Sequence, residues 1–160
     1  MSGETIEARL KTLGHVLPDL APTHEFLAVN VVGDLAYVSG HAPYLGGEFR
    51  YLGKVGRDFD LEAGRSAAQL AVLGCLSSLK EAGCLEHVSR VLKVNGYVHS
   101  DPEFQDLPKV TDAASQLLIG VFGECGRHAR TTVGVASLPL AAAVEVEMIV
   151  QLQEKRVGVK

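Results

Sequence analysis

The first part of the chain changes from a helical to a β-type pattern of hydrophobic positions. Apolar residues spaced three and four apart predict a short amphipathic helix over residues 4–14. Two β-rich runs, 26–31 and 35–38, then flank Gly33-Asp34, a dipeptide typical of a two-residue hairpin turn because glycine adopts positive φ without a steric clash. We therefore expect a helix followed by an antiparallel hairpin.

The rest of the chain predicts two long helices separated by strands. A stripe of small residues runs along residues 60–82, where Asp60 is placed to cap the helix and Gly83 to end it. A second helix is expected over residues 107–122, beginning near Pro108. The strands expected around these helices are a short edge strand near 49–52 and longer strands over 91–99, 131–136 and 142–152.

The order ββ(β)αβαββ indicates an α+β fold, in which a single sheet carries two helices packed on one face. We expect one domain over residues 1–160, since no linker, repeat or low-complexity segment divides the chain. The sheet face opposite the helices is too apolar for open water and predicts a homo-oligomer. The residues expected on that face are Val91, Asn95, Tyr97, Ala143 and Ile149.

Composition and charge narrow the class of protein and of partner. The 15 basic and 19 acidic residues give a net charge of -4, and the longest Lys/Arg run is Lys155-Arg156, which argues against a nucleic-acid partner. Three cysteines without a CxxC pair argue against a disulfide framework or a zinc site and fit a reducing cytosol. The N-terminal segment lacks the apolar stretch of a signal peptide, and no run approaches the roughly 20 apolar residues of a membrane span. We therefore expect a cytoplasmic protein without a membrane partner.

Arg130 and Glu145 are the residues most suggestive of chemistry. Arg130 stands at the start of one predicted strand and Glu145 on the next, after the turn Leu138-Pro139. If the two strands form a hairpin, the guanidinium and the carboxylate meet at one end of the sheet, where they can bind a small acid and orient a water. A cross-strand salt bridge without chemistry explains the same spacing at least as well. A neighbouring arginine would lower the pKa of Glu145, so its expected role is to orient water.

Several motifs together resemble one known family. They are Gly-His-Ala-Pro at 40–43, Arg-x-x-Val-x-Val-x-x-Leu-Pro at 130–139 and Val-Glu-Val-Glu at 144–147. With these motifs the chain resembles the RidA/YjgF family of reactive intermediate deaminases, also called L-PSP endoribonuclease-like proteins. The segments 53–56, 95–98, 108–110, 122–124 and 126–130 resemble its longer, YjgF-like endoribonuclease branch. The resemblance covers about residues 10–152.

This resemblance implies a chorismate-mutase-like fold and a homotrimer with clefts between the subunits. It implies that Arg130 binds the substrate carboxylate, that Glu145 holds the attacking water, and that backbone groups at Gly40 and Thr132 line the cleft. The reaction it implies is hydrolysis of 2-imino or enamine acids to 2-keto acids and ammonia, without a metal or an organic cofactor.

Three positions depart from the family pattern. Phe26 stands where family deaminases carry a tyrosine whose hydroxyl lines the site, so this pocket loses a polar contact. Thr132 replaces a cysteine that the family often carries, and Thr111 replaces an asparagine on the second helix.

The histidines and the family name leave alternatives open. His41 and His128 flank the expected cleft, where an imidazole could contact substrate or carry protons near neutral pH, but partly exposed hydrogen-bonding histidines are the simpler interpretation. The other four histidines lack metal-ligand spacing, so no metal site is expected. Two other functions are considered: a trimer that binds a small carboxylate without turnover, and the endoribonuclease of the family name.

Overall fold

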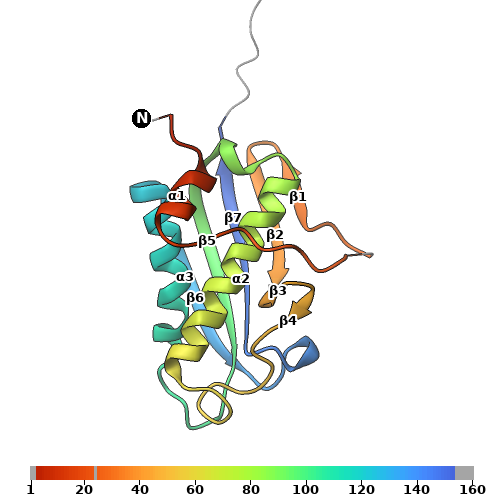
Figure 1. The fold of residues 1–160 in the computed structure, drawn as a ribbon, viewed down its shortest axis with the longest axis vertical. Coiled ribbons are helices and arrows are strands. Elements are labelled where there is room, and N and C mark those ends of the chain that lie inside the picture. Colours follow the sequence, from red (N-terminus) through yellow and green to blue (C-terminus); the bar gives the residue numbers. More distant parts are fainter. Residues whose placement is uncertain (1–2, 24, 154–160) are drawn as a thin grey trace, which may run out of the picture.

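The computed structural model describes residues 3–23 and 25–153 (Figure 1). The helices are α1 (Ile6–Thr12), α2 (Leu61–Glu81) and α3 (Leu107–Phe122), with the 3-10 turns η1 (Leu85–His87), η2 (Gly123–Gly126) and η3 (Pro139–Ala141). The strands are β1 (Val29–Val32), β2 (Leu35–His41), β3 (Tyr44–Leu45), β4 (Glu48–Phe49), β5 (Val88–His99), β6 (Ala129–Val135) and β7 (Val144–Leu152). The predicted helices are confirmed, whereas the first strand begins at Val29 rather than at Phe26.

Five of the strands form one mixed sheet in the order β1-β2-β7-β5-β6. β1 and β2 are joined by the predicted two-residue turn, with Val32 opposite Leu35. β5 and β6 run parallel, and α3 connects them, because parallel neighbours need a crossover rather than a tight turn. The hairpin predicted about Leu138-Pro139 is therefore wrong, since β5 lies between β6 and β7.

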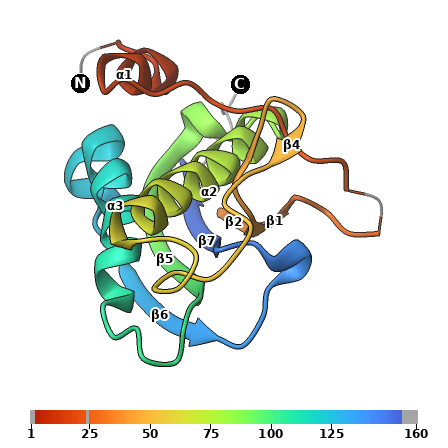
Figure 2. The same ribbon diagram turned by 60° about the horizontal axis from the view of Figure 1, so that its bottom comes forward.

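Both long helices lie on one face of this sheet, which confirms the α+β class (Figure 2). The Asp60 carboxylate accepts a hydrogen bond from the Ala63 amide at 2.8 Å and so caps α2. Gly83 follows the last turn with a φ of 68°, a conformation that suits glycine. Small residues let α2 lie close to β2 and β7. The buried ones are Gly64, Ala67, Ala68, Ala71 and Gly74.

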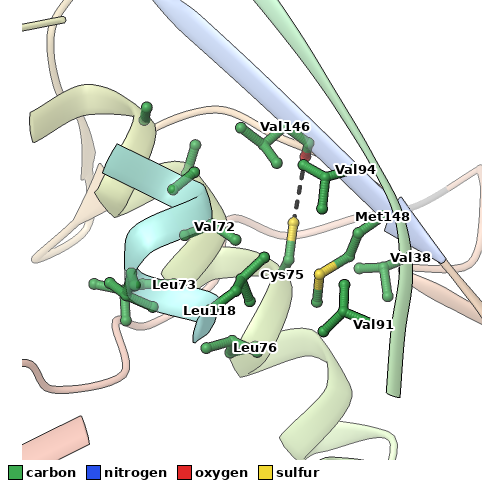
Figure 3. Packing of buried hydrophobic residues seen from close by; sticks show 14 of the residues in the cluster. Val38, Val72, Leu73, Cys75, Leu76, Val91, Val94, Leu118, Val146 and Met148 are labelled. Atoms are coloured by element: carbon green, nitrogen blue, oxygen red, sulfur yellow. Dashed lines mark hydrogen bonds between the residues drawn. The ribbon is translucent and has the colours of Figure 1, made fainter. Parts of the chain in front are cut away.

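The hydrophobic core fills the space between the helices and the sheet (Figure 3). Cys75 lies at its centre, where the thiol donates to the Val146 carbonyl at 3.3 Å. Burial raises the pKa of this thiol, which keeps it protonated and unreactive. Among the described residues, no helix has the length and apolar character that crossing a bilayer requires.

The other side of the sheet, called here the open face, carries no helix in the described part of the chain. Asn95, Tyr97 and Ile149 lie on it, as predicted. Val91 and Ala143 do not, because both are buried in the core. A register shift between Val91 and Lys93 turns Val91 toward the helices, which a strict two-residue alternation cannot reveal. Further open-face residues are Asn30, Tyr37, Lys93, Thr131, Val133, Glu145 and Glu147.

Candidate functional site

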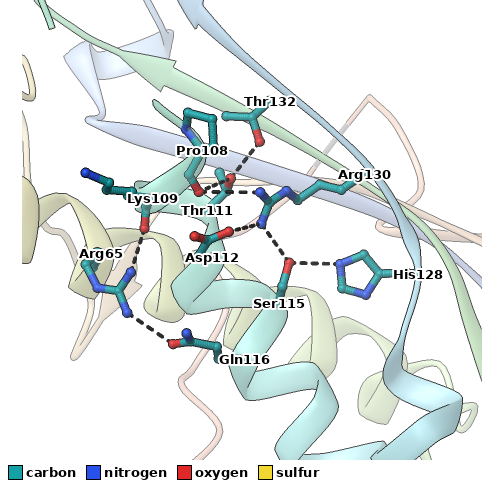
Figure 4. Close-up of polar contacts among 10 residues, drawn as sticks. All are labelled: Arg65, Pro108, Lys109, Thr111, Asp112, Ser115, Gln116, His128, Arg130 and Thr132. Atoms are coloured by element: carbon teal, nitrogen blue, oxygen red, sulfur yellow. Dashed lines mark hydrogen bonds and ion pairs between the residues drawn. The ribbon is translucent and has the colours of Figure 1, made fainter. Parts of the chain in front are cut away.

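Arg130 lies on β6, an edge strand, and its side chain extends over the first turns of α3 (Figure 4). Its Nη1 lies 2.9 Å from Oδ1 of Asp112 and donates to Oγ of Ser115 at 3.0 Å. Its Nη2 donates to the Pro108 carbonyl over a longer distance of 3.4 Å. Within residues 3–23 and 25–153, Nε has no hydrogen-bond acceptor. The Arg130 side chain is 22% exposed, and Nε is the guanidinium nitrogen that the described residues leave without a partner for a carboxylate from outside this chain.

Ser115 links the guanidinium to His128. The Ser115 Oγ lies 3.0 Å from Nε2 of His128, and Nδ1 of the same ring lies 2.6 Å from the Gly126 carbonyl oxygen. Burial is the main cause that lowers the pKa of His128, and the positive charge of Arg130 lowers it further. The imidazole is therefore neutral at pH 7 and forms part of the support of Arg130.

The two threonines that replace family residues contact each other. Oγ1 of Thr111 on α3 lies 2.6 Å from Oγ1 of Thr132 on β6, and the Thr111 hydroxyl donates to the Pro108 carbonyl at 3.2 Å. Because that bond uses the only proton of Thr111, Thr132 is the donor between the two hydroxyls. Gly96 makes room for this contact, since a Cβ there would stand 2.4 Å from Cγ2 of Thr111. The two threonines that depart from the family pattern are therefore compatible with each other, because their hydroxyls are hydrogen-bonded.

Glu145 lies half-buried on the open face, next to Gly40 of β2. Its carboxylate accepts no hydrogen bond from the residues that the structure describes. Burial raises its pKa, and the negative charge of Glu147 raises it further. The expectation of a lowered pKa is wrong within one chain, because burial and the charge of Glu147, rather than an arginine, shift the pKa of Glu145.

Glu147 differs from Glu145 because one of its carboxylate oxygens accepts two hydrogen bonds. Its Oε1 accepts from Nδ2 of Asn95 at 2.9 Å and from the hydroxyl of Tyr97 at 2.8 Å. These bonds tie the Glu147 side chain of β7 to β5 on the open face. Of the two acidic residues in the Val-Glu-Val-Glu motif, Glu145 is the one whose carboxylate accepts no hydrogen bond within the described part of the chain, whereas Glu147 accepts two on a single oxygen.

The structure does not bring Arg130 and Glu145 together within one chain. Arg130 stands opposite Val94, a core residue, so its side chain leaves the sheet on the helix side. Glu145 stands opposite Tyr97, on the open face. The two groups therefore belong to opposite faces of the sheet, and a cross-strand salt bridge between them within the chain is excluded as well.

His41 and Phe26 also lie apart from these groups. The His41 ring is on the helix side, with Nε2 2.8 Å from Oγ of Ser78 and Gly74 beneath it. Burial lowers its pKa to about 4, so it stays neutral in a packing role between β2 and α2. Phe26 precedes β1 and is 59% exposed. Among the described residues, the His41 ring bonds neither to Arg130 nor to Glu145.

The motifs, the fold and the site can now be compared with known proteins. The family model described as "YjgF/chorismate_mutase-like, putative endoribonuclease" matches residues 7–152. The chain belongs to this family. The YjgF/chorismate-mutase-like architecture accounts for the mixed five-stranded sheet with two long helices on one face.

Individual relatives of the family span nearly the whole chain. Protein TCP17 of Trypanosoma cruzi is 39% identical over 150 residues, which are 92% of this chain and 94% of that protein. A solved structure described as a "putative endoribonuclease" from Shewanella oneidensis MR-1 has a TM-score of 0.89 at 32% identity, covering 93% of this chain and 100% of that one. A 2-iminobutanoate/2-iminopropanoate deaminase of Dermatophagoides farinae is 32% identical over 116 residues, 71% of this chain and 80% of that protein.

Sequence reasoning missed the residues that surround the predicted ones. Asp112 and Ser115 hold Arg130, and Asn95 and Tyr97 hold Glu147. The spacing of Pro108, Asp112 and Ser115, four and then three residues, places them on one face of α3 and could have indicated a shared partner. In the described part of the chain, no group of three metal-ligating side chains comes together.

Proposed function

We propose that this protein hydrolyses 2-imino acids to 2-keto acids and ammonia in clefts between the subunits of a homotrimer. Arg130 of one copy binds the substrate carboxylate, and Glu145 of a neighbouring copy binds the attacking water. The observation that carries the proposal is the unpaired Nε of Arg130 together with the Glu145 carboxylate on the opposite sheet face, both without a hydrogen-bond partner among the described residues. A second copy is the simplest way for both to reach one substrate.

The chemistry needs few groups because imines already react with water. Water adds to the imine carbon while one of its protons passes to Glu145, and Glu145 delivers that proton to the imine nitrogen to give a carbinolamine. Glu145 then takes the proton of the carbinolamine hydroxyl as the C=O bond forms and gives it to the nitrogen, which leaves as ammonia when the C–N bond breaks. A thousandfold acceleration needs about 4 kcal/mol, which positioning one water and one carboxylate can supply. The raised pKa of Glu145 makes it a better proton acceptor than an ordinary glutamate.

Substitution of Arg130 tests this function. Arg130→Ala should lower kcat/KM for freshly generated 2-iminopropanoate about 100-fold, since a charge-assisted bidentate contact is lost. Ammonia release is measured with a coupled dehydrogenase. Arg50→Ala is the control, because Arg50 is an exposed arginine that pairs with Glu48 in the β3–β4 hairpin. Unchanged hydrolysis in Arg130→Ala overturns the assignment.

A carboxylate-binding protein without turnover is the second candidate. Phe26 favours it, because the position lacks the hydroxyl that the family deaminases place in the site, and Asp112 already neutralises part of the Arg130 charge. Pyruvate bound in the cleft of a protein that releases no ammonia would support it. The ribonuclease activity in the family's description is tested by assaying RNA cleavage after nuclease-free purification. A net charge of -4 disfavours RNA binding.

A further inference from the structure

We propose that Ser115 and His128 are positioning residues, which fix the Arg130 guanidinium with its Nε edge turned toward the incoming carboxylate. The proposal rests on the function proposed above for the role of Arg130, but the arrangement itself is a property of this chain. It is a directed chain of hydrogen bonds that runs from β6 through α3 and back to the segment before β6 (Figure 4).

The direction of each bond follows from the chemistry of its partners. The Gly126 carbonyl can only accept, so the 2.6 Å contact assigns a proton to Nδ1 of His128. The neutral ring then has an acceptor at Nε2, and the Ser115 hydroxyl must donate its single proton there. The lone pairs of Ser115 Oγ are consequently left for Nη1 of Arg130, at 3.0 Å. No other assignment satisfies all three contacts with a neutral imidazole.

This chain restrains the guanidinium in a way that Asp112 alone does not. A carboxylate attracts the positive charge from many directions, and the Asp112 side chain is 44% exposed, so this pair leaves the guanidinium free to turn. Ser115 adds a second contact on Nη1, and its hydroxyl is itself bonded to Nε2 of His128. With Nη1 held between Asp112 and Ser115, and Nη2 bonded to the Pro108 carbonyl, Nε is the nitrogen left to face a ligand.

The first experiment measures the guanidinium directly and does not depend on turnover. The 15N relaxation of the Arg130 Nε–H group should give an order parameter of about 0.8 in the unmodified protein and below about 0.6 in Ser115→Ala and His128→Leu. Ser115→Thr keeps the hydroxyl and should keep the order. Ser66→Ala is the matched control, because among the described residues the exposed Ser66 hydroxyl bonds to the Glu62 carbonyl of its own helix and to no other group. Unchanged order in both Ser115→Ala and His128→Leu overturns the proposal, as does a mobile Arg130 in the unmodified protein.

The second experiment links this order to substrate. Ser115→Ala should raise KM for 2-iminopropanoate about tenfold with kcat nearly unchanged, because a loosened clamp weakens ground-state and transition-state binding alike. Ser115→Thr should restore KM, which loss of general stability would not predict. If Arg130 loses order in Ser115→Ala while the unmodified protein releases no ammonia, the positioning role stands and the imine-hydrolysis function fails. If KM stays constant although the order is lost, the role in binding is wrong.

Discussion

At the scale of single residues, Gly40 determines where the Glu145 carboxylate lies. A Cβ at position 40 would stand 2.0 Å from Oε1 and 2.9 Å from Cδ of Glu145, closer than any real contact. The clashing atoms belong to the end of a flexible, half-buried side chain rather than to the backbone. An added methyl group would therefore move Glu145 aside without unfolding the sheet.

Gly40→Ala is expected to separate activity from stability. Imine hydrolysis should fall at least tenfold, toward the level of Glu145→Gln, because the displaced carboxylate no longer holds the water. The free energy of unfolding, from urea denaturation, should change by less than about 1 kcal/mol, since alanine also reduces the entropy of the unfolded chain. Gly3→Ala, in open space, controls for the substitution itself. Full activity in Gly40→Ala would show that Glu145 does not act from this position.

At the scale of the elements, the sequence identifies helices and strands but not the neighbour of β6. The patterns around Asp60 and Pro108 locate α2 and α3 well, because caps and helical periodicity are local signals. The partner of β6 depends on the crossover β5–α3–β6, and Leu138-Pro139 suggested a hairpin instead. The position of Arg130 on the helix side follows from that crossover, so Asp112 and Ser115 could not be predicted as its partners.

The contact between β2 and α2 contains a histidine whose ionisation is linked to folding. His41 packs on Gly74 and bonds to Ser78, and burial lowers its pKa from about 6.5 to about 4. The unfolded chain therefore binds a proton at this position before the folded chain does. The stability that the neutral ring contributes is present above about pH 6.5 and is lost as the pH falls toward 4.

This linkage predicts the acid sensitivity of the fold. Between pH 7 and pH 5, the His41 contribution to the free energy of unfolding should fall by about 2 kcal/mol, and His41→Gln should remove that part of the pH dependence. Urea denaturation at both pH values and one protein concentration measures it. His87→Gln, at an exposed position, should leave the pH dependence intact. If the free energy of unfolding changes equally with pH in the unmodified protein and in His41→Gln, the assignment of a buried, neutral His41 ring is wrong.

At the scale of the whole molecule, the open face and the edge strand β6 are the surfaces on which we expect self-association. Tyr37 and Val133 of the open face are 44% and 41% exposed, which exposes large apolar groups to water. Burying this face against other copies removes that cost. The same contact is expected to bring Glu145 close to Arg130 of a neighbouring copy. Within one chain, the two residues lie on opposite faces of the sheet. Self-association and catalysis are thus expected to depend on one interface.

Mixing two inactive variants tests whether each site draws on two copies. Arg130→Ala retains Glu145, and Glu145→Gln retains Arg130, so a cleft between one copy of each can hold both groups. Random assembly of equal amounts should restore about a quarter of the native hydrolysis if every cleft joins two subunits. Co-expression allows the subunits to mix, and ammonia release gives the activity. Neither variant should recover when it is co-expressed with the double variant, because one of the two groups is then missing from every subunit. If the mixed assemblies stay inactive, Arg130 and Glu145 do not act in a shared cleft, since only a site between copies can be repaired by exchange of subunits.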